Sequence, residues 1–374
     1  MQQTYWPALD GLRAISVVMV LCFHQGFMWM TGGYIGVSVF FTLSGFLITT
    51  LLIAEFDESG RISLGDFYAR RLRRLLPASL SCLVGVAIVA RLGGFSLAED
   101  LEMAVLAALG QVANWEMLLG GSRIGNFRDF FSPTAHFWSL AIEEQFYLLW
   151  PITLAYICSR APRHRSRVIV VGAFALAGVA AAPIVARVFG PDAAYWSTPA
   201  RLGEVMMGAL LAVVSRGGKV PERHHRMVVV LGIVAAAGIV VAAVFLPKSG
   251  GPAFSGWLGV GSVLSCGVVA SALIRGPMTT LLSSTPLVML GRVSYGVYLY
   301  HWPIFLLIAT GNSSIAIFLV RVTVTLALAS ASYVWLERPI RLRRSSNGST
   351  GRVAGLSVAA VALAVVMIVP SAPR

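Results

Sequence analysis

The first apolar stretch of the sequence, ALDGLRAISVVMVLCFHQGF, carries an arginine and a histidine in line with each other. Arg13 and His24 are eleven residues apart. On an α-helix that spacing is about three turns, so both side chains fall on one face, about 16 Å apart along the axis. Histidine exchanges protons near neutral pH, and a charge inside a membrane is costly. The spacing therefore predicts a functional site; the structural alternative is that Arg13 snorkels and His24 bonds a neighbouring helix.

A second polar face occurs in HFWSLAIEEQFYLLWP. His136, Ser139 and Glu143 follow the i, i+3, i+7 spacing of one helical face. The adjacent Glu144 and Gln145 point elsewhere on the same helix. An interfacial belt of aromatic residues is the alternative interpretation. It explains the tryptophans of this segment well and its two adjacent glutamates poorly, so the segment predicts a carboxylate site.

Two later segments also carry polar residues at helical spacing. Ser294, Tyr298 and His301 share a face by i, i+4, i+7 within GRVSYGVYLYHWPI. A structural polar network and a functional site explain these three residues equally well. Arg201 and Glu204 lie three residues apart and can pair on one face. For this pair a structural ion pair is favoured over direct chemistry.

Four arginines precede the third apolar segment, within FYARRLRRLLPA. Arg70, Arg71, Arg73 and Arg74 are expected at the cytoplasmic surface. One interpretation is that they only orient the membrane helices. The other is that they bind a phosphorylated cytosolic donor, because the planar guanidinium group matches phosphate. Composition alone does not separate these two interpretations.

Composition places all these residues in a helical membrane protein. The chain has 374 residues, of which 57% are hydrophobic and 12% are charged, against about 25% charged in soluble domains. The net charge of +13 is concentrated in arginine-rich loops, which indicates membrane topology rather than nucleic-acid binding. The cysteines lie in apolar segments without metal-like spacing, so buried side chains and no metal are expected. They are Cys22, Cys82, Cys158 and Cys266.

Hydropathy and the arginine-rich loops predict an all-α polytopic fold with eleven crossings. The predicted spans are residues 8–30, 34–54, 76–92, 137–158, 168–189, 199–215, 227–246, 256–275, 285–309, 314–336 and 353–370. Residues 99–119 are polar and are expected to lie on the surface or re-enter without crossing. The predicted organisation is a ten-helix body over residues 1–340, a cytoplasmic linker over 341–352, and one added helix over 353–374. The N-terminus is then cytoplasmic and the C-terminus extracytoplasmic.

This topology sorts the polar residues by depth. The residues towards the cytoplasm are Arg13, Arg71, Arg74 and Arg292. The residues towards the outside are His24, Glu143, Arg201, Glu204 and His301. The layout predicts a cationic entrance on the cytoplasmic side and, nearer the outside, a site that binds and releases protons.

These segments resemble acyltransferase family 3, the membrane-bound O-acyltransferases that modify bacterial surface glycans and some antibiotics. The stretch LDGLRAISVVMVLCFH resembles its signature of arginine, ten residues and histidine, at Arg13 and His24. GGYIGVSVFFTLSGFLIT resembles the glycine-rich second helix, where members often have aspartate and this chain has Ser38, to which no role is carried. RRLRRLLPA resembles the Arg-x-x-Arg motif, which aligns with Arg71 and Arg74.

Two further segments extend the resemblance to about residues 5–340. FWSLAIEEQFYLLWP resembles the family block that contains the characteristic glutamate, at Glu143. SYGVYLYHWPI resembles the late helix with the matching histidine, at His301. Each motif alone is weak, and the five motifs in this order form a strong signal.

The resemblance implies a multi-pass enzyme of the bacterial cytoplasmic (inner) membrane. Its donor would be cytoplasmic acyl-CoA, usually acetyl-CoA, and its acceptor a sugar hydroxyl of a cell-surface glycan or glycolipid. Partners would be these substrates and the lipid bilayer, with no nucleic acid and no metal. Some relatives carry an extracytoplasmic SGNH hydrolase-like domain after an eleventh helix. Such a domain is expected in the full-length protein or as a separate partner.

The mechanistic hypothesis assigns a role to each group of residues. His24 is the base or a transient acyl carrier, Glu143 is its partner, and Asp10 is a reserve carboxylate at the wrong depth. The donor-binding residues would be Arg13, Arg71 and Arg74, with Arg70 and Arg73. The substrate-site residues would be Ser139, Arg201, Glu204, Ser294, Tyr298 and His301. The rival is a glycolipid or proton-coupled transporter or flippase, and a non-catalytic scaffold leaves the aligned ionisable residues unexplained.

Overall fold

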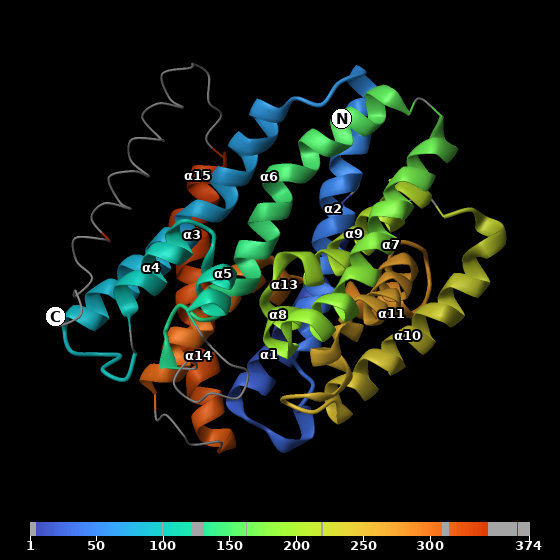
Figure 1. Ribbon diagram of the computed structural model, residues 1–374. Coiled ribbons are helices and arrows are strands. Elements are labelled where there is room, and N and C mark those ends of the chain that lie inside the picture. The colour runs from blue at the N-terminus through green and yellow to red at the C-terminus, as the bar shows by residue number, and fades with distance from the viewer. Residues whose placement is uncertain are drawn as a thin grey trace. The chain divides into compact units, whose positions relative to one another are not determined.

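The computed structural model describes residues 5–98, 100–120, 131–161, 163–217, 220–308, 314–342 and 365. The regular structure of these residues is entirely helical, which confirms the predicted all-α polytopic fold (Figure 1). Its long helices are α1 (Pro7–Gln25), α2 (Ile35–Ser59), α3 (Leu64–Arg91), α6 (Phe137–Arg160), α7 (His164–Phe189), α9 (Thr198–Val214), α10 (His225–Phe245), α11 (Leu258–Ala272), α13 (Thr285–Leu307) and α14 (Ile315–Ser332). The shorter elements are η1 (Met28–Met30), α4 (Leu101–Leu109), α5 (Ala113–Leu119), α8 (Pro191–Trp196), η3 (Glu222–His224), η4 (Ala253–Trp257), α12 (Pro277–Leu282), η5 (Tyr333–Glu337) and α15 (Arg338–Leu342).

Seven helical segments among the described residues are long and apolar enough to cross a membrane. They contain α1, α2, α3, α7, α10, α11 and α14. The predicted spans at α6, α9 and α13 are also helical, although they are not among these seven. These three helices carry Glu143, Arg201 and His301. The predicted linker over 341–352 and the predicted span over 353–370 fall almost wholly outside the described residues.

The helix that contains the third predicted span begins earlier than the span itself. The span was expected at residues 76–92, with the four arginines ahead of it, whereas α3 starts at Leu64 and contains all of them. Arginine and leucine are strong helix formers, so the basic segment continues the helix. Pro77 lies inside α3 without ending it. The arginines are therefore held on a rigid helix rather than in a loop.

The segment predicted to lie on the surface or re-enter contains two short helices, α4 and α5. The chain breaks between α4 and α5, where Gln111 has a positive φ of 56°. A left-handed residue cannot continue a right-handed helix. Neither α4 nor α5 is among the seven segments that can cross a membrane.

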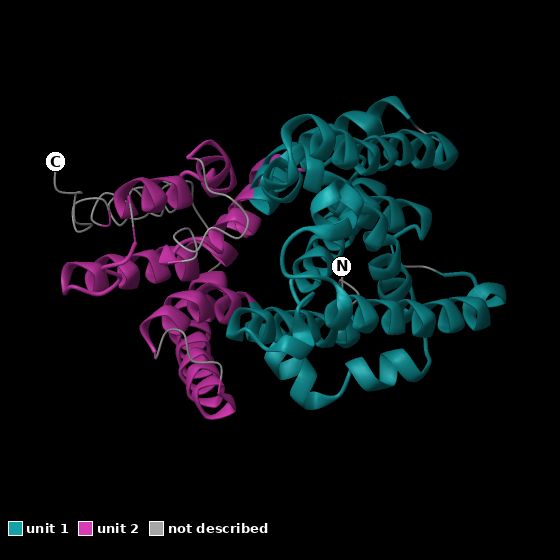
Figure 2. Ribbon diagram, turned by 60° about the horizontal axis from the view of Figure 1, so that its bottom comes forward, with its two compact units in different colours: residues 1–62, 142–294 teal, residues 63–141, 295–374 magenta. Residues whose placement is uncertain are grey.

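The chain divides into two compact units, which Figure 2 shows in two colours. Unit 1 comprises residues 1–62 and 142–294. Within it, α9 packs against α2, α7 and α11. A Cβ on Gly208 would lie 1.8 Å from a carbonyl oxygen of α2, and one on Gly203 would lie 2.7 Å from the backbone of Gly178 in α7. Small residues let helix backbones approach closely in a membrane, so α9 and its polar side chains are enclosed.

Unit 2 comprises residues 63–141 and 295–374. Within it, α3 packs against η5 and α15. The hydroxyl of Tyr300 lies 2.5 Å from Ser81 Oγ and donates to Ser332 Oγ at 3.0 Å. These hydrogen bonds join α3, α13 and α14. By residue range, α6 and α13 contribute to both units.

Candidate functional site

Helix α1 carries both Arg13 and His24, as the first apolar stretch predicts. Pro7 lies in its first turn, where a missing N–H is tolerated, and Gly26 ends it with φ 86°. Arg13 Nη1 donates to Asp10 Oδ1 at 3.0 Å. His24 is half-buried in the last turn of the helix. Asp10, the reserve carboxylate, thus bonds Arg13 at the opposite end of α1 from His24.

Two hydroxyl groups hold the Glu143 carboxylate in α6. Its Oε1 accepts a hydrogen bond from Ser44 Oγ of α2 at 2.9 Å, and its Oε2 accepts one from the Tyr147 hydroxyl at 2.9 Å. Both carboxylate oxygens are therefore fixed. The i+4 spacing of Tyr147 is visible in the sequence, whereas Ser44 is 99 residues away. The pairing of His24 with Glu143 stays a prediction.

Two other side chains of α6 tie this helix to its neighbours in unit 1. Thr198 Oγ1 of α9 donates to Gln145 Oε1 at 2.6 Å. Trp150 Nε1 donates to Thr49 Oγ1 of α2 at 2.8 Å. Gln145 thus bonds α9 while Glu143 bonds α2, so these nearby polar residues have different partners, as their helical spacing predicts.

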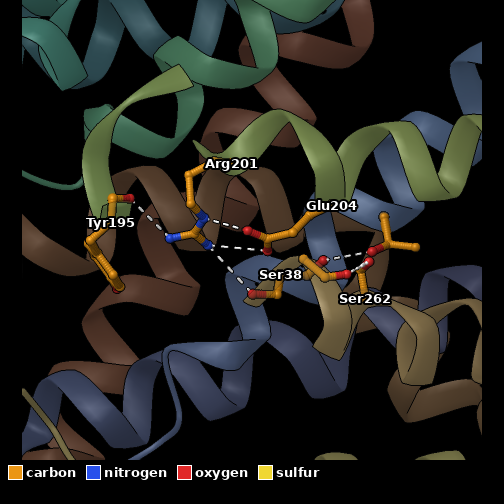
Figure 3. Close-up of polar contacts among 7 residues, drawn as sticks. Ser38, Tyr195, Arg201, Glu204 and Ser262 are labelled. Carbon is orange, nitrogen blue, oxygen red and sulfur yellow. Dashed lines mark hydrogen bonds and ion pairs between the residues drawn. The ribbon is translucent and has the colours of Figure 1, made fainter. Parts of the chain in front are cut away.

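Arg201 is directed at Glu204 and Ser38, as Figure 3 shows. Its Nε donates to Glu204 Oε1 at 2.5 Å, and its Nη2 donates to Glu204 Oε2 at 3.3 Å and to Ser38 Oγ at 3.5 Å. Its Nη1 donates to the carbonyl oxygen of Tyr195 at 3.2 Å. Arg201 is 1% exposed and Glu204 is 0% exposed. The predicted ion pair is therefore present and buried, and its role towards a substrate stays a prediction.

Aromatic rings connect His24 with Arg201 inside unit 1. The ring centroid of Phe23 lies 5.3 Å from that of His24 and 5.4 Å from that of Tyr34. Tyr34 lies 6.0 Å from Tyr195, whose ring centroid lies 5.0 Å from the guanidinium carbon of Arg201. Burial raises the pKa of Tyr195 to about 12, so its phenol is neutral. The sequence did not indicate this contact between Phe23, Tyr34 and Tyr195, because aromatic residues are common throughout membrane helices.

Four of the predicted residues come together in unit 2. Ser139 Oγ lies 2.6 Å from the Tyr298 hydroxyl, and the two lie 3.3 and 3.2 Å from the His136 carbonyl oxygen. His301 Nδ1 lies 2.6 Å from the Tyr298 carbonyl oxygen. That oxygen can only accept, so Nδ1 carries the proton in this bond. The His136 and His301 rings are 5.5 Å apart. The separate helical faces predicted for these residues therefore meet in one cluster.

The four arginines of α3 differ in exposure. Arg70 is exposed, and Arg71, Arg73 and Arg74 are half-buried. Glu337 of η5 interacts electrostatically with Arg74. The basic segment is therefore partly embedded in unit 2 rather than a fully solvated surface run.

Ser294, the remaining predicted site residue, is buried in unit 1 at 4% exposure. Among the described residues, no group of three or more histidine, cysteine, aspartate or glutamate side chains is placed to hold a metal ion. Three cysteines are buried as predicted, whereas Cys266 is only half-buried. Its Sγ donates to a carbonyl oxygen of α9 at 3.5 Å, so the thiol still faces a neighbouring helix.

Comparison with known proteins relates this chain to acyltransferases. An acyltransferase domain family matches residues 6–369. The O-acetyltransferase OatA of Staphylococcus aureus (strain NCTC 8325 / PS 47) is 30% identical over 349 residues, which are 90% of this chain and 57% of the relative. The peptidoglycan O-acetyltransferase OatA of Listeria monocytogenes serovar 1/2a is 30% identical over 349 residues, 90% of this chain and 56% of the relative. The chain therefore spans little more than half the length of these relatives. No solved structure matches it significantly.

Proposed function

This chain belongs to the acyltransferase family whose domain matches residues 6–369, and from that premise we propose that it is a membrane O-acyltransferase. It would move an acyl group, most simply acetyl, from cytoplasmic acyl-CoA to a sugar hydroxyl of a cell-surface glycan or glycolipid. The names of the relatives support acetyl as the group and peptidoglycan as one acceptor class. In this proposal the membrane is the bacterial inner membrane and the N-terminus is cytoplasmic.

The observation that best supports the proposal is the arrangement of polar groups in unit 1. His24 and Arg13 lie near opposite ends of one helix, and the Glu143 carboxylate is fixed by two hydroxyl groups. A histidine with a carboxylate partner is a common base in acyl transfer, because the carboxylate orients the imidazole and stabilises its protonated form. An arginine at the other end of the helix suits an anionic donor.

In the proposed reaction, His24 takes the proton of the acceptor hydroxyl while the oxygen of that hydroxyl attacks the thioester carbonyl carbon. The tetrahedral intermediate then expels the thiolate of coenzyme A, which recovers the proton from His24. The products are the O-acylated acceptor and the free thiol. In the two-step alternative, an imidazole nitrogen of His24 attacks the thioester carbonyl carbon and expels the thiolate of coenzyme A, which takes the imidazole proton. The acceptor hydroxyl then attacks the acylated imidazole, which gives the O-acylated acceptor and returns neutral His24.

The other predicted residues would serve the two substrates. Arg13, Arg71 and Arg74, with Arg70 and Arg73, would bind the phosphates of the donor. The acceptor-side residues would be Ser139, Arg201, Glu204, Ser294, Tyr298 and His301.

The proposed activity is tested with purified protein in detergent, acetyl-CoA and a peptidoglycan-type sugar acceptor. We expect release of free coenzyme A that depends on the acceptor, together with an O-acetylated sugar detected by mass spectrometry. The rival transporter predicts no coenzyme A release, and instead movement of a labelled glycolipid across proteoliposome membranes. That second pattern would exclude the enzyme.

The Arg71→Ala substitution is expected to raise the KM for acyl-CoA at least about tenfold, because a charge-assisted hydrogen bond contributes about 1.5–3 kcal/mol. The turnover number at saturating donor should change little, since the guanidinium group would bind the donor equally before and during reaction. Steady-state kinetics against acyl-CoA measure both values. Arg91→Ala, an exposed arginine in the last turn of the same helix, is the matched control. An unchanged donor KM in the Arg71 variant would remove this residue from the donor site.

The Glu143→Gln substitution is expected to lower the turnover number about 10–100-fold, because a neutral amide stabilises a protonated histidine poorly. Glutamine still accepts one hydroxyl hydrogen bond, so the helix contacts with Ser44 and Tyr147 are largely kept. Glu144→Gln changes the neighbouring carboxylate in the same way and serves as control. Equal rates in the two variants would contradict a catalytic role for Glu143.

A further inference from the structure

A chain of hydrogen bonds connects two arginines near the start of α1. Arg13 Nη1 donates to Asp10 Oδ1 at 3.0 Å, and the Tyr5 hydroxyl donates to Asp10 Oδ2 at 2.8 Å. The same hydroxyl accepts from Arg292 Nη2 at 3.1 Å and lies 3.4 Å from Arg292 Nε. The guanidinium carbon of Arg292 also lies 5.7 Å from the Tyr5 ring centroid. One carboxylate thus links both cations, to Arg13 directly and to Arg292 through a phenol.

Close backbone packing fixes the helices that carry these two arginines. A Cβ on Gly291 would lie 1.9 Å from the Asp10 carbonyl oxygen, and a Cβ on Gly11 would lie 1.8 Å from the Leu282 carbonyl oxygen. No side chain fits at either point, so α1 touches α12 and α13 backbone to backbone. Each glycine directly adjoins the network, since Gly11 follows Asp10 and Gly291 precedes Arg292. The close contact of these helix backbones therefore fixes the positions of the two arginine backbones relative to each other.

The charges of the network do not cancel. Two guanidinium groups and one carboxylate leave a net charge of +1 within the network. Asp10 is 7% exposed, whereas Arg292 is exposed and the Arg13 side chain is 20% exposed. The N-terminus of α1 adds a partial positive charge at the same end. The accessible part of the network is therefore cationic, and its only carboxylate is the least accessible member.

A purely structural role explains one half of this arrangement. Asp10 in the first turn of α1 favours the helix dipole, and its ion pair with Arg13 stabilises that turn. An ion pair that only stabilises the first turn of α1 needs a single cation. It does not account for a second, exposed arginine held against the same carboxylate by a phenol.

We propose that Arg13 and Arg292 form a phosphate-binding pair, and that Asp10 and Tyr5 are the positioning residues that orient it. Two planar guanidinium groups suit a phosphate, because each can donate two parallel hydrogen bonds to its oxygens. The phosphate belongs either to the nucleotide part of the acyl donor, which rests on the proposed function, or to an anionic lipid headgroup. Arg292, which the sequence motifs did not assign, is the new ligand in this pair.

The experiment compares Arg292→Ala with Arg275→Ala in the full chain. Arg275 is an exposed arginine between α11 and α12 of the same unit, so its loss removes the same charge elsewhere. In the first arm, coenzyme A binding is measured by calorimetry in nanodiscs of phosphatidylcholine. In the second arm, thermal unfolding is measured in nanodiscs with and without added phosphatidylglycerol. Arg292 is exposed, so its replacement should leave the fold intact.

If the phosphate belongs to the donor, Arg292→Ala weakens coenzyme A binding about tenfold, whereas Arg275→Ala changes it by less than about twofold. If it belongs to a lipid, only the stabilisation by phosphatidylglycerol is lost in Arg292→Ala. The phosphate-binding pair is wrong if Arg292→Ala matches Arg275→Ala in both arms. Failure of the unaltered protein to bind coenzyme A would instead contradict the proposed donor, and the lipid arm would still decide the pair.

Tyr5→Phe tests the positioning role separately, since it removes only the hydroxyl between Arg292 and Asp10. We expect the affected ligand to bind about threefold more weakly. In the Arg292→Ala background the same change should have no further effect, because the hydroxyl acts through that arginine. Additive losses would show that the Tyr5 hydroxyl acts independently of Arg292, which contradicts its role in orienting that arginine.

Discussion

Replacing His24 with alanine is expected to reduce acyl transfer at least about 100-fold, because general acid–base catalysis contributes about 10²–10⁴ and an acyl carrier would be lost entirely. The donor KM should remain close to that of the unaltered protein, since Arg13 at the other end of α1 keeps its ion pair with Asp10. A large loss of turnover with a preserved donor KM identifies a residue that acts in the transition state. A residue that only packs the helix would instead lower the amount of folded protein.

The measurement is coenzyme A release by purified protein, with thermal unfolding recorded for each variant. His164→Ala, at the start of α7, is the matched control, because it removes a histidine from unit 1 outside the proposed site. Near-normal turnover of His24→Ala would exclude His24 as base and as carrier. Incubation with radiolabelled acetyl-CoA without acceptor separates these two roles, since only a carrier retains label on the protein of unaltered sequence and loses it in His24→Ala.

The fold was predictable from the sequence wherever hydropathy alone decides it. The long apolar segments that the structure describes are all helical, because a membrane leaves the backbone few other ways to satisfy its hydrogen bonds. The start of α3 was missed, since its first turns are too polar for a hydropathy reading although arginine and leucine favour a helix. The break at Gln111 was missed for a different reason, because a single left-handed residue leaves no periodic signal.

The site was predictable only where its members lie close in sequence. The Arg201–Glu204 pair and the i+4 contact of Glu143 with Tyr147 follow from helical spacing. The contacts of Glu143 with Ser44 and of Tyr5 with Arg292 bridge segments far apart in the chain. Such contacts depend on which helices pack together, and glycine positions determine that packing only once the partner helix is known.

Replacing Glu204 with glutamine is expected to destabilise the protein by about 3–5 kcal/mol, because it leaves the Arg201 guanidinium buried without its counter-ion. Both side chains are almost completely inaccessible, and Arg201 donates to both carboxylate oxygens of Glu204. The contacts of Arg201 with Ser38 and the Tyr195 carbonyl are neutral and do not replace the lost charge. Denaturant or thermal unfolding in detergent measures the change.

The matched control is Asp57→Asn, which makes the same chemical change in an ion pair of unit 1 whose carboxylate is largely accessible. Asp57 lies 3.4 Å from Arg167 and its side chain is 63% exposed, so its loss should cost less than about 1 kcal/mol. A similar small cost for Glu204→Gln would mean that the buried site is hydrated and that the ion pair does not stabilise unit 1.

The double variant Arg201→Met with Glu204→Leu then separates structure from chemistry. It removes both charges while keeping apolar volume in α9, so we expect most of the stability to return. Turnover per folded molecule is the quantity to measure in this variant, because no buried charge is left unpaired to destabilise the protein. Turnover close to that of the unaltered protein would assign the pair to the architecture of α9. Turnover that stays low in a stable protein would support a role for Arg201 or Glu204 at the acceptor, because the loss then does not come from unfolding.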